Sequence, residues 1–230
     1  MRAILAAVFS FALASGLQAQ GSEPPVVVEL YTSQGCSSCP PADALMAELA
    51  PREDVIALAL HVDYWDYIGW TDNYGSPAFT RRQKGYASAA GARTIYTPQF
   101  VVGGRDHVVG YKPMQLAEMI ADDAARDKPV SLSLSRNGNR LKIRAESREP
   151  GKMLVQLARY QPHASVAIER GENAGKTIDY FNIVTALEVV SDWNGRAPLD
   201  LSVTVRGSEP VVVLIQKDGH GPVLAAARLR

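Results

Sequence analysis

The first half of the chain alternates between short β-branched runs and stripes of apolar residues at helical spacing. The run VVVEL at 26–30 predicts a buried strand, and DVIALALHVD at 54–63 predicts a second strand that is apolar on both faces. Between them, PPADALMAELA at 40–50 combines an apolar stripe with prolines suited to the first turn of a helix. Similar patterns predict two further helices, at 77–89 and 113–128. They also predict two further strands, at 95–102 and 107–111.

The second half of the chain lacks helical stripes. VSLSLS at 130–135 alternates apolar and polar residues, and similar runs recur every ~8–12 residues between Asn-Gly, Pro-Gly and Asp-Gly turn signals. Such spacing is typical of an antiparallel β-sandwich. We therefore expect an α/β domain over residues 22–128, followed by an all-β antiparallel sandwich-like domain over residues 129–230.

The first 21 residues have the pattern of a signal peptide. Arg2 is followed by an apolar run over 3–14 and then by small and polar residues. The apolar run is shorter than the ~20 residues that a membrane-spanning helix needs. We therefore expect cleavage near Ala19, export to a periplasm or beyond, and no membrane span once residues 1–21 are removed. Such compartments permit disulfides.

The composition and net charge of the chain limit the kinds of molecule it is expected to bind. The chain has 24 Lys and Arg against 24 Asp and Glu, which gives a formal net charge of +0. A hydrophobic fraction of 47% with 21% charged residues argues against a disordered chain. Without a net positive charge, nucleic acid is not an expected partner.

Cys36 and Cys39 are the only cysteines, and they lie in YTSQGCSSCPP at the expected strand–helix junction. A C-x-x-C in this setting is typical of a thioredoxin-like redox site. A purely structural bond between them would close a tiny loop and contribute only about 2 kcal/mol, so a staple is disfavoured. We expect Cys36 to attack a disulfide as a thiolate and Cys39 to resolve the mixed disulfide.

The function expected from this pair is that of an exported thiol–disulfide oxidoreductase-like protein. Its substrates would be the thiols and disulfides of other exported proteins, and a separate redox partner would exchange electrons with it. No cofactor is needed for this chemistry, because the two sulfurs carry the electrons.

The reactivity of Cys36 depends on where the following helix begins. A helix that began at Cys36 would place the positive end of its dipole at the sulfur but would put Pro40 inside the first turns, which strains the helix. A helix that began at Pro40 or Pro41 would leave Cys36 outside and reduce the effect of the dipole. The sequence is compatible with both.

Residues 95–120, IYTPQFVVGGRDHVVGYKPMQLAEMI, resemble the C-terminal half of a thioredoxin fold. The resemblance implies a cis bond between Thr97 and Pro98, with Pro98 packed beside the C-x-x-C segment. It also implies that the backbone of Thr97 pairs with bound substrate. The alternative is a trans proline that opens an edge strand.

The segment ELYTSQGCSSCPPAD at 29–43 resembles an exported bacterial family of unknown function that has a thioredoxin-like domain. Thioredoxins keep a buried acid on the first strand as the proton acceptor for the second thiol. Glu29 is the candidate for this role, although it lies one residue further from Cys36 than the thioredoxin pattern requires. A contact with solvent or between domains is the alternative for Glu29.

Two other interpretations involve the residues around Cys36 and Cys39. Cys36, Cys39 and His61 could form a mixed sulfur and nitrogen metal site in a metallochaperone, although no second ligand pair is evident in the sequence. The aromatic residues that follow, with Trp65 and Tyr67 as the candidate substrate-binding side chains, could form a peptide-binding lip or bury an interface. A non-enzymatic adaptor, which binds a partner through its β domain, is the remaining possibility.

Overall fold

The computed structural model describes residues 24–230, so the predicted signal peptide lies outside the described residues. Within this part of the chain, no helix is both long and apolar enough to cross a bilayer. Helices and strands follow in the order β1 (Val26–Thr32), α1 (Pro40–Leu49), β2 (Val55–His61), the 3-10 helix η1 (Asp66–Ile68), α2 (Pro77–Ala89), β3 (Gln99–Val102), β4 (Asp106–Val109), α3 (Pro113–Ala124), β5 (Val130–Asn137), β6 (Arg140–Ser147), β7 (Met153–Ala167), β8 (Thr177–Trp193), β9 (Leu199–Thr204), β10 (Val211–Lys217) and β11 (Val223–Leu229).

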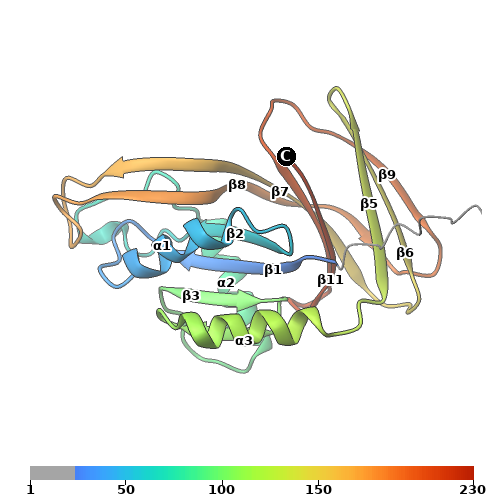
Figure 1. Ribbon diagram of the computed structural model, residues 1–230, viewed down its shortest axis with the longest axis horizontal. Helices are drawn as coiled ribbons and strands as arrows, with labels where there is room; N and C mark the ends of the chain where they lie inside the picture. Colours follow the sequence, from blue (N-terminus) through green and yellow to red (C-terminus); the bar gives the residue numbers. More distant parts are fainter. Residues whose placement is uncertain (1–23) are drawn as a thin grey trace, which may run out of the picture.

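The strands form two sheets (Figure 1). The larger sheet has eight strands in the order β11-β10-β7-β8-β2-β1-β3-β4, and the smaller has β5-β6-β9. β1 pairs with β2 in parallel, starting from Val26 opposite Val55, and with β3 in antiparallel. β1 is therefore interior to the sheet and is buried along its whole length, as its apolar run predicts.

The eight-stranded sheet crosses the predicted domain boundary at residue 128. β8 pairs with β2 in parallel at Ile183 and Ala59, and Asn182 Nδ2 donates to the carbonyl of Ala57 at 2.9 Å. The predicted boundary at residue 128 therefore does not separate two sheets, because four strands of the second half continue the sheet of the first. The physical reason lies in β2, which is buried on both faces and would otherwise present unpaired backbone groups at an apolar edge.

Only β5, β6 and β9 form a sheet of their own in the second half, at one end of the molecule (Figure 1). The pairing is antiparallel throughout, as the alternating pattern predicts. Leu141 and Ile143 of β6 pack against Val155 of β7 and Val213 of β10 in one apolar cluster. The three-stranded sheet therefore packs its apolar side against β7 and β10 of the larger sheet.

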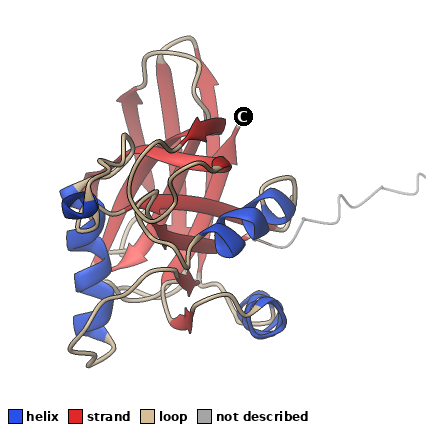
Figure 2. Ribbon diagram, turned by 90° about the vertical axis from the view of Figure 1, so that its left-hand side faces the viewer, coloured by secondary structure: helices blue, strands red, loops and turns tan. Residues whose placement is uncertain are grey.

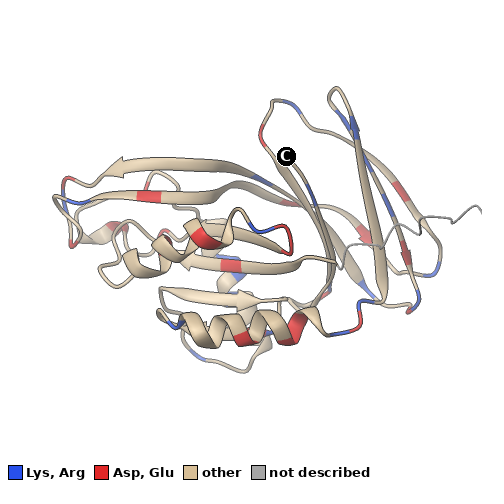
Figure 3. Cartoon of the chain, in the orientation of Figure 1, with Lys and Arg blue, Asp and Glu red and all other residues tan. Residues whose placement is uncertain are grey.

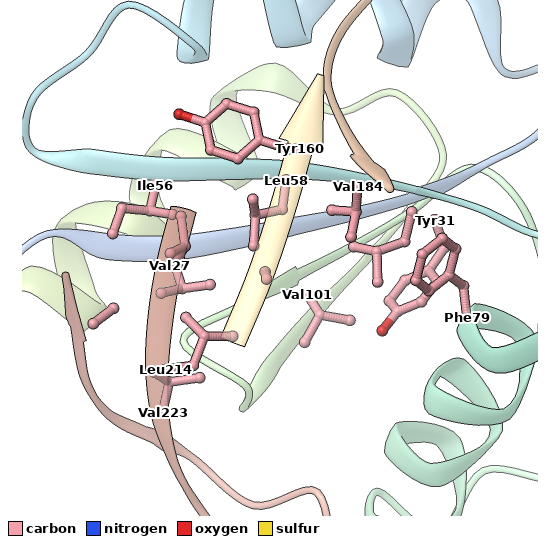
Figure 4. Packing of buried hydrophobic residues seen from close by; sticks show 14 of the residues in the cluster. Val27, Tyr31, Ile56, Leu58, Phe79, Val101, Tyr160, Val184, Leu214 and Val223 are labelled. Atoms are coloured by element: carbon pink, nitrogen blue, oxygen red, sulfur yellow. The ribbon is translucent and has the colours of Figure 1, made fainter. Parts of the chain in front are cut away.

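Helices lie on both faces of the eight-stranded sheet (Figure 2). Successive residues of β1 point to opposite faces, so Val28 and Leu30 pack with α1 and α3 while Val27 and Tyr31 pack with α2. Figure 4 shows the apolar cluster on the α2 side of the sheet. In this cluster Leu214 of β10 and Val223 of β11 pack with Val27 and Tyr31 of β1. Basic and acidic residues are interspersed along the chain (Figure 3).

Candidate functional site

The C-x-x-C segment occupies the loop between the end of β1 and the start of α1. Cys36 and Cys39 are joined by a disulfide with their Cα atoms 5.4 Å apart. The Cys36 N–H donates to the carbonyl of Ser33 at 3.1 Å, and the Cys39 N–H donates to the carbonyl of Cys36 at 3.2 Å. These bonds make two successive tight turns, which hold the cysteines at the carboxyl end of a central strand.

The helix begins after the second cysteine. Cys39 is the N-cap and Pro40 is the first helical residue, so Cys36 lies outside the helix. Pro40 and Pro41 also lack the N–H groups that the first turn of a helix normally offers to an anion. The helix therefore stabilises a Cys36 thiolate less than one beginning at Cys36 would.

Thr97 lies beside the disulfide loop. The Thr97–Pro98 peptide bond is cis, which confirms that expectation. The Ser38 hydroxyl donates to the carbonyl of Thr97 at 3.4 Å, and its oxygen lies 3.4 Å from Cys36 Sγ. One residue of the C-x-x-C segment thus contacts both the first cysteine and the backbone before Pro98.

Trp65 and Tyr67 form one side of this region. Trp65 Nε1 donates to Thr97 Oγ1 at 2.7 Å, and the Trp65 and Tyr67 rings stack with centroids 6.3 Å apart. Trp65 also lies against Gly35, where an added Cβ would come within 3.1 Å of Trp65 Cβ. Tyr67 is 80% exposed, so its ring is the more accessible of the two.

Asp43 is a buried carboxylic acid in the first turns of α1, next to the disulfide loop. Its N–H donates to the carbonyl of Cys39 at 3.0 Å, and its Oδ1 accepts from Thr32 Oγ1 at 2.7 Å. Its second oxygen is buried without a hydrogen-bond partner. Burial raises the pKa of Asp43 to about 7, although nearby His61 opposes the rise.

The hairpin of β7 and β8 reaches the same loop from the far half of the sequence. Asn173, at the hairpin tip, donates from Nδ2 to the carbonyls of Gln34 and Cys36, both at 2.9 Å. Its neighbour Glu172 accepts from the Ser37 N–H through Oε2 at 3.3 Å. Figure 1 shows this tip beside the loop between β1 and α1.

Of the two roles considered for Glu29 from the sequence, proton acceptor or contact residue, its surroundings favour a contact role. Both of its oxygens accept from the Arg82 guanidinium, at 2.6 and 2.7 Å, and the hydroxyls of Tyr31 and Tyr86 add bonds at 2.8 Å. Burial alone would raise the pKa of Glu29, but the Arg82 charge and these hydrogen bonds hold it below its ordinary value. A carboxylate held ionised in this way is a poor proton acceptor, so Glu29 is a structural ion-pair partner.

His61 also has a structural partner. Its Nδ1 lies 2.7 Å from Asp72 Oδ2, with both side chains fully buried, and its ring meets the edges of Tyr74 and Tyr180. Within residues 24–230, no three His, Cys, Asp or Glu side chains gather in a way that could hold a metal ion. The alternative metal site of Cys36, Cys39 and His61 is therefore not assembled.

Comparison with known proteins identifies the family. The family model described as a protein of unknown function, DUF1223, matches residues 27–216. The chain belongs to this family. No curated protein matches it.

Two solved structures resemble this DUF1223 protein. An X-ray crystal structure of a protein from Agrobacterium tumefaciens is 31% identical, with a TM-score of 0.78, over 90% of this chain and 95% of that one. The structure titled HBP35 of Porphyromonas gingivalis is 12% identical, with a TM-score of 0.66, over 90% of this chain and 75% of that one. At 12% identity the second likeness concerns the fold alone.

Two residues at the site of this DUF1223 protein escaped the sequence analysis. Asp43 carries a visible signal, since it is an acid four residues after Cys39, but an acid in the first turn of a helix is ordinarily explained by the helix dipole alone. Asn173 carries none, because it lies 137 residues from Cys36 and only the long hairpin brings it there.

Proposed function

We propose that this DUF1223 protein is a thiol–disulfide oxidoreductase that acts on exported proteins, with its disulfide carried by a thioredoxin-like arrangement of the elements from β1 to α3. The observation that carries the proposal is the Cys36–Cys39 disulfide at the carboxyl end of a central strand, linked through Ser38 to the backbone of Thr97. Signal-peptide features in residues 1–21 support export, and a separate redox partner would restore the disulfide.

The proposed reaction needs only the two sulfurs of the protein and two of the substrate. A substrate thiolate attacks Cys36 Sγ, so that a new S–S bond forms while the Cys36–Cys39 bond breaks and its electron pair leaves on Cys39 Sγ, which takes a proton. The second substrate thiolate then attacks the substrate sulfur of the mixed disulfide and releases Cys36. The substrate dithiol is oxidised to a disulfide, and the protein disulfide is reduced to a dithiol. The reverse sequence reduces a substrate.

Thr97, Trp65 and Tyr67 are the proposed substrate contacts in this reaction. The backbone of Thr97 lies next to the disulfide loop, and the stacked rings of Trp65 and Tyr67 lie on the same side. An extended peptide placed along Thr97 would meet the exposed Tyr67 ring. Aromatic surface of this kind contributes binding area with few rotatable bonds.

Replacing Cys36 by serine should abolish disulfide exchange, because the remaining thiol, Cys39, is fully buried and has no second cysteine with which to form a disulfide. The measurement is insulin reduction in the presence of dithiothreitol, together with refolding of reduced ribonuclease. Loss of the small disulfide loop costs only about 2 kcal/mol, so the variant is expected to fold, which circular dichroism checks. Cys39→Ser should instead trap mixed disulfides. Equal activity of wild type and Cys36→Ser would refute the proposal.

The reduction potential of the Cys36–Cys39 pair decides the direction of the reaction. A value of about −120 mV would identify an oxidant, and one of about −270 mV a reductant. Because α1 begins after Cys36, its dipole does little to stabilise a Cys36 thiolate, and the reduced form lacks this source of stabilisation. On that ground we expect a value closer to the reducing end.

A further inference from the structure

The cysteines are buried although the segment between them is not. Cys36 is 1% exposed and Cys39 is fully buried, while Ser37 and Ser38 are exposed. Thiol–disulfide exchange requires the attacking sulfur to reach a disulfide sulfur. In the arrangement described above, an incoming thiolate has almost no surface of Cys36 to approach. Something beside Cys36 has to move before the proposed reaction can begin.

Besides Thr97 and Asp72, which hydrogen-bond to Ser38 and Gln34, two segments contact the residues around Cys36. One is the aromatic segment 64–70, in which Trp65 bonds to Thr97 and Trp70 Nε1 donates to Gln34 Oε1 at 2.8 Å. The other is the tip loop, residues 169–175 between β7 and β8. Of the two segments, only the tip loop hydrogen-bonds to Cys36 itself, since Asn173 shares the Cys36 carbonyl with the N–H of Cys39.

Hydrogen bonds hold the tip loop at both its base and its apex. At the base, the Ile168 N–H donates to the carbonyl of Lys176 at 2.9 Å, and the Gly175 N–H donates to the carbonyl of Ile168 at 2.8 Å. Ile168 is buried in a cluster with Trp70, so the base is fixed. At the apex, the attachment to the C-x-x-C loop is the pair of bonds from Asn173 and the longer contact of Glu172 with the Ser37 N–H.

Asn173 is placed to hold the tip loop against the C-x-x-C loop. It is fully buried although its neighbours in the tip loop are exposed, and Lys176 Nζ donates to its Oδ1 at 2.9 Å. This bond orients the amide so that both hydrogens of Nδ2 point at carbonyl oxygens of the C-x-x-C loop. Breaking these two hydrogen bonds and the longer Glu172 contact would free the apex while the base stays in place.

We infer that the tip loop is a gate over the disulfide and that Asn173 is the latch that holds it closed. This inference rests on the proposed function, since the gate controls access of a substrate thiolate to Cys36 Sγ. With the gate closed, the carbonyls of Gln34 and Cys36 are held and Cys36 is buried. With the gate open, the thiolate reaches Cys36 Sγ, the Cys36–Cys39 bond breaks, and Cys39 leaves as described above.

The test measures how fast dithiothreitol reduces the disulfide of the full chain, followed by alkylation and mass spectrometry. For the wild type, the rate should rise with dithiothreitol at first and then level off, because opening becomes limiting. Asn173→Ala should raise the initial slope by about tenfold, since it removes two hydrogen bonds from the closed state. Asn173→Asp keeps the acceptor for Lys176 but sets a carboxylate against two carbonyl oxygens, so its slope should rise further.

The matched control is Asn137→Ala, which removes an exposed asparagine at the turn after β5, in the smaller sheet. Its reduction rate should equal that of the wild type. Circular dichroism melts verify that all variants are folded, and the conservative size of Asn173→Asp provides a second folded variant if alanine destabilises the hairpin.

The equilibrium reduction potential separates a gate from an electronic effect. A gate changes the rates of reduction and reoxidation together and leaves the potential at its wild-type value. Initial slopes for both Asn173 variants within twofold of Asn137→Ala would overturn the inference, and so would a potential shift large enough to explain the faster rates. Because dithiothreitol is the only thiol used, this result is independent of whether the protein acts on exported substrates.

Discussion

Replacing Arg82 by leucine is expected to lower the free energy of unfolding by about 3–5 kcal/mol, because it leaves the buried Glu29 carboxylate without its counter-charge. The two side chains are 8% and 2% exposed and form a bidentate pair. Arg82 also donates to Gln156 of β7 at 2.8 Å, so the same change removes a contact between the two halves of the chain. Urea unfolding followed by circular dichroism measures the loss.

The neighbouring Arg81 provides the matched control for this experiment. It is exposed on α2, so Arg81→Leu should change the free energy of unfolding by less than about 0.5 kcal/mol. Adding Glu29→Gln to Arg82→Leu removes the orphaned charge and should recover part of the loss. A loss for Arg82→Leu no larger than that for Arg81→Leu would show that the pair does not stabilise the fold.

Replacing Asp43 by asparagine is expected to remove a pH dependence of stability worth about 4 kcal/mol. Burial raises the pKa of Asp43 from 3.8 to about 7 in the folded protein. Between these two values the folded chain binds one more proton than the unfolded chain, so the wild type loses stability as the pH rises through this window. Asparagine keeps an acceptor for Thr32 Oγ1 and has no proton to lose.

Urea unfolding at pH 5 and pH 8 tests this expectation. Because pH 5 already lies above the unfolded pKa, part of the effect is lost there, and Asp43→Asn should gain about 2.7 kcal/mol over the wild type between pH 5 and pH 8. The exposed Asp122 on α3 supplies a control, since Asp122→Asn should leave the difference between the two pH values unchanged. If Asp43→Asn and wild type differ equally at pH 5 and pH 8, Asp43 does not titrate in this range.

Asp43 also bears on the proposed redox chemistry. Its unpartnered oxygen is buried one helical turn from Cys39, in a group that includes the His61–Asp72 pair. A pKa of about 7 makes a carboxyl group able both to accept and to give up a proton near neutral pH. By contrast Glu29, the acid expected from the sequence, is held ionised by Arg82.

The secondary structure of residues 25–128 was predictable because its signals are local. Apolar periodicity, prolines in first turns and β-branched runs act within a few residues of each other, and they predicted β1, α1, β2, α2, β3, β4 and α3 in the correct order. The strands of the second half were predictable for the same reason. Their sheet partners were not predictable. An apolar strand such as β8 can pair with another strand of a sandwich or with β2, and its own residues do not distinguish the two.

The sequence by itself determined that two cysteines three residues apart would lie between a strand and a helix, and its resemblance to a thioredoxin fold implied the cis bond before Pro98. Only the tertiary structure decided what surrounds them. Arg82 neutralises Glu29, the α1 packing buries Asp43, and the β7–β8 hairpin carries Asn173 to the carbonyl of Cys36. Each of these outcomes depends on residues tens of positions away or more, because burial and charge are set by whatever the folded chain brings near, and neighbours in sequence do not specify it.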